Sequence, residues 1–219
     1  MSTINWAGYV VASNMTNPQP TVTGVTASWN VSTVSPSTSN AFAAAWIGIG
    51  GDQFDKTLIQ CGTEEDSIFG QTRYSAWYEL LPNNSITIPT INISPGDVIQ
   101  ASIQLTNGTL NQWVINLTDT ANGQTFQNTF TYNSSQLSAE WIVERPTING
   151  APSRLADFGA ITFYNCTATI GSTTGPIESF PENPLVMYSS TSRNAVQLTD
   201  VSALNSDGNS FTVNYLASG

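Results

Sequence analysis

Two polar side chains stand alone in otherwise apolar runs of this sequence. Gln60 lies in the run 58–62 (LIQCG), and Glu144 ends the run 139–144 (AEWIVE). Burying an unpaired amide or carboxylate among apolar groups is costly, so such side chains mark where a protein keeps its chemistry. A carboxylate can take a proton from water and return it, and an amide can donate a hydrogen bond to a developing oxyanion. Gln60 and Glu144 are therefore the first candidates for catalytic groups.

The sequence contains no histidine, which excludes several kinds of active site. A Ser-His or Cys-His nucleophile, a histidine general base and a His-ligated zinc ion all require an imidazole. Cys61 is a poor nucleophile because no base and little positive charge are available to activate it. Cys61 and Cys166 can form one disulfide or stay as two buried thiols, and their spacing does not decide between these.

Charged residues are few and mostly acidic. Only 9% of the 219 residues are charged, five Lys and Arg stand against fifteen Asp and Glu, and the net charge is -10. The five basic residues do not cluster, so nucleic acid binding is excluded. With so few basic groups, protonating the carboxyls in acid leaves little self-repulsion to unfold the chain. This composition favours an acidic, extracellular setting.

Neither end of the chain nor its interior carries a membrane signal. The first residues, MSTINW, lack both the charged and the apolar region of a secretory leader, and no apolar run is long enough to span a bilayer. We expect a protein without membrane contact, either soluble or the mature part of a secreted one.

The hydrophobic pattern has a period of two, which is typical of β-strands. Strands are predicted at 85–93, 98–105, 112–119, 125–132, 160–164 and 210–216, and Asn-Gly or Asp-Gly pairs mark turns at 107–108, 122–123, 149–150 and 207–208, with another at 95–97. The stretch 35–40 is predicted to be a long loop. Many antiparallel strands and no helical repeat indicate an all-β sandwich or barrel, formed by one domain over residues 1–219.

Alternation along the strands places several candidate residues on one face. Glu140 and Glu144 share a face, Trp77 shares one with Glu79, and Gln60 points the same way as Leu58. A sheet face with aromatic rings, an amide and carboxylates is a candidate binding groove. An ordinary solvated sheet face would carry the same pattern.

Six ordered motifs resemble those of the glutamic peptidases, or eqolisins. They are NWAG at 5–8, AWIGI at 45–49, LIQ with a following glycine at 58–62, Tyr74 with AWYE at 76–79, AEWIVE at 139–144, and ADFG with TF at 156–163. The resemblance covers nearly all of residues 5–170, and six motifs in order are more specific than any one of them.

The resemblance implies a fold, an activity and a set of site residues. The fold would be a sandwich of two large, bent antiparallel sheets of the concanavalin-like kind. The activity would be that of a secreted, acid-active endopeptidase that is insensitive to pepstatin. The catalytic glutamine falls on Gln60 and not on Gln53, and the catalytic glutamate falls on Glu144. The residues that would line or support the substrate groove are Trp6, Trp46, Tyr74, Trp77, Glu79 and Glu140.

The sequence departs from the family pattern at two places. Relatives usually carry Asp where this chain has Gly50, and Asp follows their catalytic Glu where Arg145 stands here. Both changes remove negative charge, so we expect a site that is less acidic than in those relatives. With Glu144 as the base, activity at low pH would follow if its pKa stays near the ordinary carboxylate value of about 4.

Two other functions fit the same face. A glycosidase needs two carboxyls about 5 to 9.5 Å apart, whereas Glu140 and Glu144 are four residues apart on one strand, roughly 13 Å at ~3.3 Å per residue; a cross-strand pair with Glu79 stays open. A carbohydrate-binding sandwich would use the aromatic rings without catalysis, with Glu64, Glu65 and Asp66 on calcium or simply in a solvated loop. For the peptidase we expect polypeptide substrates, no cofactor or metal, and a monomer.

Overall fold

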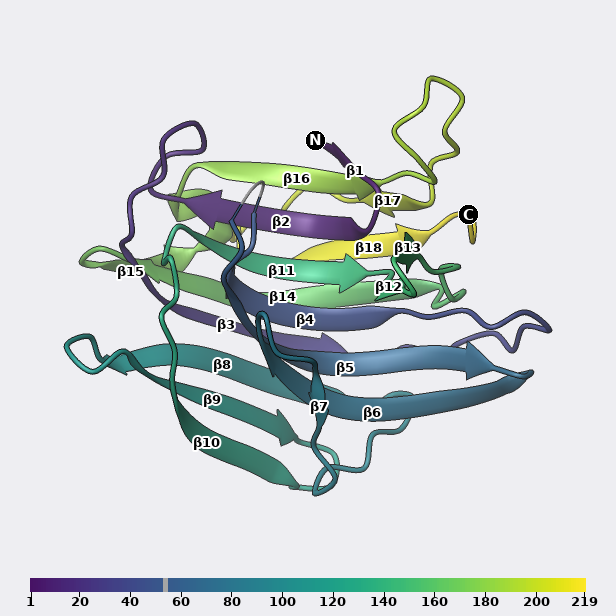
Figure 1. The fold of residues 1–219 in the computed structure, drawn as a ribbon, viewed down its shortest axis with the longest axis horizontal. Coiled ribbons are helices and arrows are strands. Elements are labelled where there is room, and N and C mark those ends of the chain that lie inside the picture. The colour runs from purple at the N-terminus through teal and green to yellow at the C-terminus, as the bar shows by residue number, and fades with distance from the viewer. Residues whose placement is uncertain (53–54) are drawn as a thin grey trace.

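The fold consists of two large β-sheets packed face to face (Figure 1). The structure is a computed structural model that describes residues 1–52 and 55–219, so Gln53 lies outside the described residues. Within them, the one helical element is a 3-10 turn, Ile177–Ser179. No helix in this part of the chain is long and apolar enough to cross a membrane. The predicted all-β sandwich is confirmed.

The first sheet carries the candidate site. In spatial order its strands are β1 (Ser2–Thr3), β16 (Glu182–Met187), β2 (Trp6–Ala12), β11 (Ser138–Glu144), β4 (Ala44–Gly50), β5 (Leu58–Ile68), β6 (Gln71–Leu80) and β7 (Ile86–Thr87). β1 pairs with β16 in parallel, and the other neighbours in this sheet pair antiparallel.

The second sheet is entirely antiparallel and backs the first. Its order is β10 (Thr125–Thr131), β9 (Gln112–Asp119), β8 (Val98–Asn107), β3 (Val22–Asn30), β14 (Ala160–Ile170), β18 (Phe211–Tyr215) and β17 (Thr199–Val201), with β15 (Thr173–Pro176) also on β14. A separate small hairpin joins β12 (Thr147–Ile148) to β13 (Ala151–Pro152).

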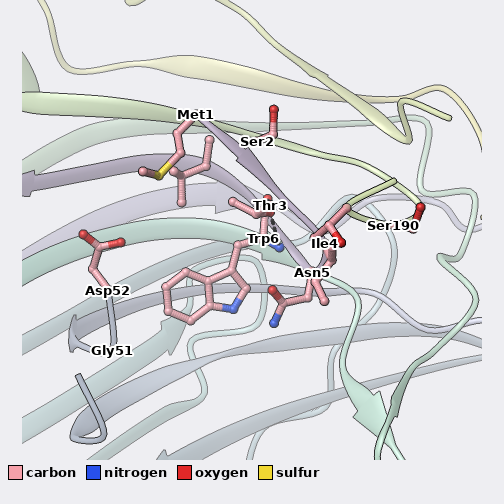
Figure 2. A pocket seen from close by; sticks show the side chains of 11 residues that line it. Met1, Ser2, Thr3, Ile4, Asn5, Trp6, Gly51, Asp52 and Ser190 are labelled. Carbon is pink, nitrogen blue, oxygen red and sulfur yellow. Dashed lines mark hydrogen bonds between the residues drawn. The ribbon is translucent and has the colours of Figure 1, made fainter. Parts of the chain in front are cut away.

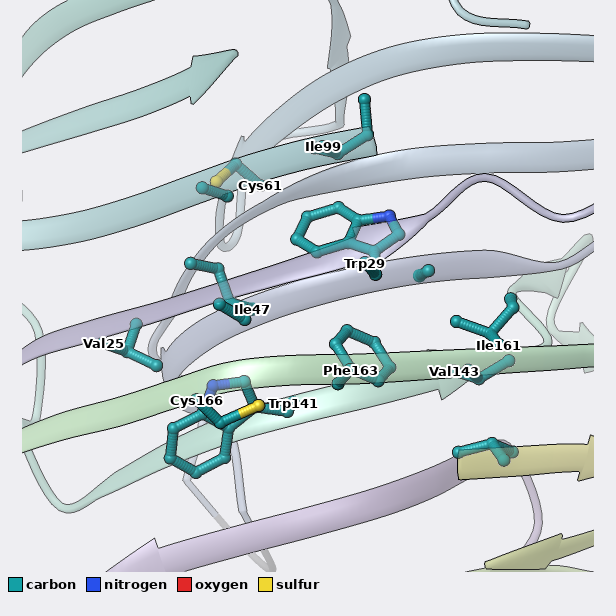
Figure 3. Packing of buried hydrophobic residues seen from close by; sticks show 14 of the residues in the cluster. Val25, Trp29, Ile47, Cys61, Ile99, Trp141, Val143, Ile161, Phe163 and Cys166 are labelled. Carbon is teal, nitrogen blue, oxygen red and sulfur yellow. The ribbon is translucent and has the colours of Figure 1, made fainter. Parts of the chain in front are cut away.

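The core fills the space between the sheets with large side chains (Figure 3). Trp29 and Phe163 of the second sheet pack with ring centroids 5.6 Å apart. Two indole N–H groups connect the sheets: Trp141 donates to the Thr26 carbonyl at 2.8 Å, and Trp29 donates to the Thr63 hydroxyl at 3.0 Å. These two indole N–H groups therefore have partners that also fix the sheets against each other.

The central strands of the first sheet are buried on both faces. β4 and β11 are buried along almost their whole length, whereas β8 and β9 alternate between buried and more exposed positions. The outer face of the first sheet is covered by a second apolar cluster that includes Val10, Trp46, Trp77, Ile142 and Leu185. A lone polar group on this outer face is thus held among apolar neighbours at the edge of solvent.

One predicted strand is largely wrong. The segment 85–93 forms only the two-residue β7 before it leaves the sheet. Pro89, two residues after the end of β7, lacks the N–H that a continued strand would need. Ile88 and Ile91 are nevertheless buried, whereas Ile86 is 51% exposed. The strand predicted at 160–164 begins as expected but runs six residues further, to Ile170. The other predicted strands, the turns and the loop at 35–40 lie where the sequence placed them, within a few residues.

Cys61 and Cys166 are both free and buried. Burial raises the pKa of each thiol above its ordinary value because the thiolate would lose its solvation. The question that the sequence left open is therefore settled as two buried thiols within the core (Figure 3).

Candidate active site

Gln60 and Glu144 line the same cavity on the outer face of the first sheet. The cavity has a volume of about 480 Å³, and its wall also includes Trp6, Trp77 and Glu79. The simplest arrangement for two cooperating side chains would be on neighbouring strands. Gln60 and Glu144 are not arranged in this way, because β4 lies between β5 and β11. Their side chains therefore reach the cavity from either side of β4.

Small residues on β4 leave room for these longer side chains. Gly48 stands opposite Gln60 on β5, and Ala44 stands opposite Glu144 on β11. Between them Trp46 lies against two glycines. A β-carbon added to Gly48 would come within 2.8 Å of the Trp46 ring, and one added to Gly62 would come within 2.6 Å of Trp46 Cβ. The glycines of both motifs thus make space for the indole.

Trp46, on the neighbouring strand, supports the carboxyl of Glu144. Its indole Nε1 donates to Glu144 Oε2 at 2.9 Å, and the Trp6 ring packs edge-on against Trp46 with centroids 4.9 Å apart. Trp46 is fully buried and does not line the cavity, so it holds the carboxyl and leaves the substrate space to others.

The carboxyl of Glu144 is harder to ionise than the sequence suggested. Burial raises its pKa from 4.5 to about 7, hydrogen bonds from Trp46, Trp6 and Asn5 oppose the rise, and the charge of Glu79 adds to it. The condition stated above for activity at low pH, a pKa of about 4, is thus not met in the ligand-free protein. The carboxylate form that can accept a proton becomes populated as the pH approaches this raised pKa.

The amide of Gln60 is fixed on one side only. Gln60 is 4% exposed, and its Nε2 donates to Glu79 Oε2 at 2.5 Å. Its Oε1 is buried and accepts no hydrogen bond from the described residues. Burial also raises the pKa of Glu79, while the hydrogen bonds from Gln60 and from the Ser85 backbone oppose this.

Tyr74, one of the predicted groove residues, lies away from the cavity. Tyr74 is on the opposite face of β6 from Trp77 and Glu79, packs against the main core, and accepts a hydrogen bond from the Val34 backbone at 3.0 Å through its hydroxyl. Tyr74 is three residues from Trp77 on one strand, so the alternation of side chains already placed the two on opposite faces. Tyr74 supports the sheet and does not line the cavity.

Glu140 is on the outer face, as predicted, but it is fully buried and does not line the cavity of Gln60 and Glu144. Its carboxyl oxygens have no hydrogen-bond partner of good geometry among the described residues. Burial raises its pKa well above the ordinary value, and the charges of Asp52 and Asp55 add to this effect. Glu140 is therefore a buried neighbour of the site, and its surroundings favour the uncharged form of its carboxyl.

The acidic triplet at 64–66 does not form a common site. Strand alternation sends Glu65 into the core, where the Thr63 hydroxyl donates to it at 2.8 Å, while Glu64 points to the cavity and accepts from Ser75 at 2.8 Å. Among the described residues, no group of three or more Cys, Asp or Glu side chains is placed to hold a metal ion.

The two departures from the family pattern have local explanations. Arg145 turns to the other face and donates to the carbonyl groups of Ile4 at 2.7 Å and Ser189 at 3.0 Å, so its charge ties loops together away from the cavity. A β-carbon at Gly50 would meet Asp55 Oδ2 at 3.1 Å. The carboxyl of Asp55 thus lies beside the place where relatives carry an acidic side chain. The expectation of a less acidic site does not follow from Arg145.

Sequence reasoning missed several residues of the cavity wall. Asn5 hydrogen-bonds Glu144. Its place in the first motif, directly before Trp6, was the signal from which it could have been found. Glu64, within β5, and Leu58, at its start, share the face of Gln60 by strand alternation. The remaining wall residues come from strand ends and loops, where no periodicity marks them: Ala44, Leu81, Asn84, Ser85, Pro146 and Thr147.

A second cavity adjoins the first. It has a volume of about 930 Å³ and shares Asn5 and Trp6 with the cavity of Gln60 and Glu144. Figure 2 shows the Trp6 ring between the side chains of Asp52 and Asn5, with the first residues of the chain beside it. Trp6 is therefore a shared wall between two adjoining hollows.

Comparison with known proteins finds curated relatives over much of the chain. Aspergillopepsin-2 of Aspergillus niger is 37% identical over 143 residues, which are 63% of this chain and 50% of that protein. Scytalidopepsin B of Scytalidium lignicola is 31% identical over 177 residues, 75% of this chain and 63% of that protein. The chain thus spans about half to two thirds of the length of these curated relatives.

A solved structure extends the similarity to the whole fold. Scytalido-glutamic peptidase with a transition-state-analogue inhibitor superposes with a TM-score of 0.79 at 26% identity, covering 97% of this chain and 98% of that one. The sequence pattern of the Peptidase A4 family matches residues 4–215. The family resemblance read from the motifs is thereby confirmed, and the chain belongs to the Peptidase A4 family.

Proposed function

We propose that this protein is an endopeptidase that hydrolyses polypeptides with Glu144 and Gln60. The observation that carries the proposal is the placement of both side chains in one cavity of a Peptidase A4 fold. A related peptidase binds a transition-state-analogue inhibitor, which supports a hydrolytic site in this fold. The similarity to peptidases does not favour a carbohydrate-binding or glycoside-hydrolysing role. Glu140 is buried outside the cavity, and Glu79, which lies in the cavity with Glu144, is hydrogen-bonded to Gln60.

The chemistry needs no group beyond these side chains and water. The carboxylate of Glu144 takes a proton from a water molecule as the water oxygen attacks the peptide carbonyl carbon. The Gln60 amide donates a hydrogen bond to the oxyanion of the tetrahedral intermediate. Glu144 then returns the proton to the amide nitrogen as the C–N bond breaks, which leaves a carboxylic acid and an amine.

The substrate chain has room to cross both cavities. Trp6 and Asn5 line both hollows, so a polypeptide at Gln60 and Glu144 can extend past Trp6 toward Leu185. Residues 1–219 would act as one domain, since a single core draws on both sheets. We also propose a secreted, monomeric protein of acidic surroundings, which its net charge of -10 and five basic residues support.

The test is hydrolysis of a denatured protein between pH 3 and pH 7, with and without pepstatin. We expect cleavage that pepstatin does not inhibit and that increases from pH 3 toward pH 7, because the ionised fraction of Glu144 rises as the pH approaches its raised pKa. Mass spectrometry of the products would show internal cuts. Cleavage of a polysaccharide without cleavage of protein would overturn the proposal.

A further inference from the structure

We propose that Glu79 is a positioning residue that acts through Gln60. Its carboxyl holds the Gln60 amide so that the second N–H faces the substrate carbonyl oxygen and Oε1 faces the attacking water. This inference rests on the proposed function and gives Glu79 a role other than binding the substrate directly.

The hydrogen bonds of Gln60 carry the inference. Glu79 on β6 stands directly opposite Gln60 on β5, and Gln60 Nε2 donates to Glu79 Oε2 at 2.5 Å. A glutamine amide has two N–H donors and one acceptor oxygen. One N–H is thus engaged by Glu79, while the buried Oε1 accepts nothing from the described residues. A buried acceptor without a hydrogen-bond partner destabilises the folded state, so the fold retains Oε1 unpaired at a cost in stability.

Glu79 itself is held in place from a second direction. The backbone N–H of Ser85 also hydrogen-bonds its carboxyl, and Ser85 lies in the segment after β6 that lines the cavity. Two donors therefore bind one carboxyl, which favours a single orientation. A glutamine side chain without such an anchor would sample several rotamers, and a misplacement of ~1 Å in an active site can cost roughly 10²-fold in rate.

Glu79 also affects the base through its charge. Its carboxylate raises the pKa of Glu144, because two like charges face the same cavity. Removing the carboxyl should therefore change two separate properties: the placement of Gln60 and the pH at which Glu144 ionises. A residue that only stabilises the fold would change neither.

The test compares Glu79→Ala with the wild type on one peptide substrate. We expect kcat to fall by roughly 10²-fold with KM within about threefold, and the acidic limb of the kcat/KM profile to move to lower pH. In a Gln60→Ala background the same change should have little further effect, since groups that act as a unit are not additive. Glu182→Ala, which removes an exposed carboxyl on β16, is the matched control and should behave as wild type.

Two results would overturn the inference. A rise in KM of tenfold or more with unchanged kcat would show that Glu79 contacts the substrate, and an undiminished loss in the Gln60→Ala background would show that it acts independently. If Glu79→Ala does not fold, Glu79→Gln replaces it: one oxygen then serves two donors, and we expect kcat to fall by about tenfold. An inactive wild type would count against the proposed function instead.

Discussion

At the scale of single residues, Gly62 makes room for the indole that supports the carboxyl of Glu144, the proposed base. We expect Gly62→Ala to lower the melting temperature by several degrees and kcat/KM by about tenfold or more. The new β-carbon would come within 2.6 Å of Trp46 Cβ and still closer to the Ala45 carbonyl oxygen. Backbone atoms cannot yield as a flexible side chain can, so Trp46 would shift away from Glu144.

Gly108→Ala is the control, because the nearest atom to its added β-carbon is Leu105 Cδ2 at 3.7 Å. Thermal melts and steady-state kinetics on both variants check the comparison. Wild-type stability and activity in Gly62→Ala would mean that Trp46 does not depend on the glycine.

Single residues were predictable from the sequence where their chemistry conflicts with their surroundings. Gln60 and Glu144 stand out because they are polar within apolar strands, and both lie in the cavity. The support that Trp46 gives to Glu144 could not be read, since the direction of its ring depends on glycines from two strands. Tyr74 was misplaced although its odd-even position already separated it from Trp77.

At the scale of elements, alternation and turn residues located most strands but not their neighbours. The strand expected at 112–119 is β9, with the same bounds. The one expected at 85–93 is only the two-residue β7, which ends two positions before Pro89. Strand order is set by pairing between distant segments, so no local pattern indicates that β4 separates β5 from β11. Glu79, by contrast, lies beside Gln60 through the hairpin of the consecutive strands β5 and β6.

At the scale of the whole molecule, buried carboxyls favour the folded state in acid. Burial raises the pKa of Glu65 from 4.5 to about 8 and that of Asp66 from 3.8 to about 7. Below the unfolded values both states are protonated and the contribution to stability is fully present. As the pH rises from about 4 to 8, the unfolded chain releases these protons first, so stability is lost.

We therefore expect a higher melting temperature at pH 4.5 than at pH 8, measured by circular dichroism. Glu65→Gln should raise the melting temperature at pH 8 by at least a few degrees while changing it little at pH 4.5, because no buried charge then forms. The exposed Asp200→Asn is the control. A melting temperature that rises from pH 4.5 to 8 would contradict this explanation.

The central claim is that Glu144 is the base, and the most direct measurement is kcat/KM of Glu144→Gln on a peptide substrate beside Glu140→Gln. Glutamine keeps the shape of the side chain but cannot take the proton of water. We predict a loss of at least roughly 10²- to 10⁴-fold for Glu144→Gln in a folded protein, with most activity retained in Glu140→Gln. An active Glu144→Gln protein beside an inactive Glu140→Gln protein would contradict the account.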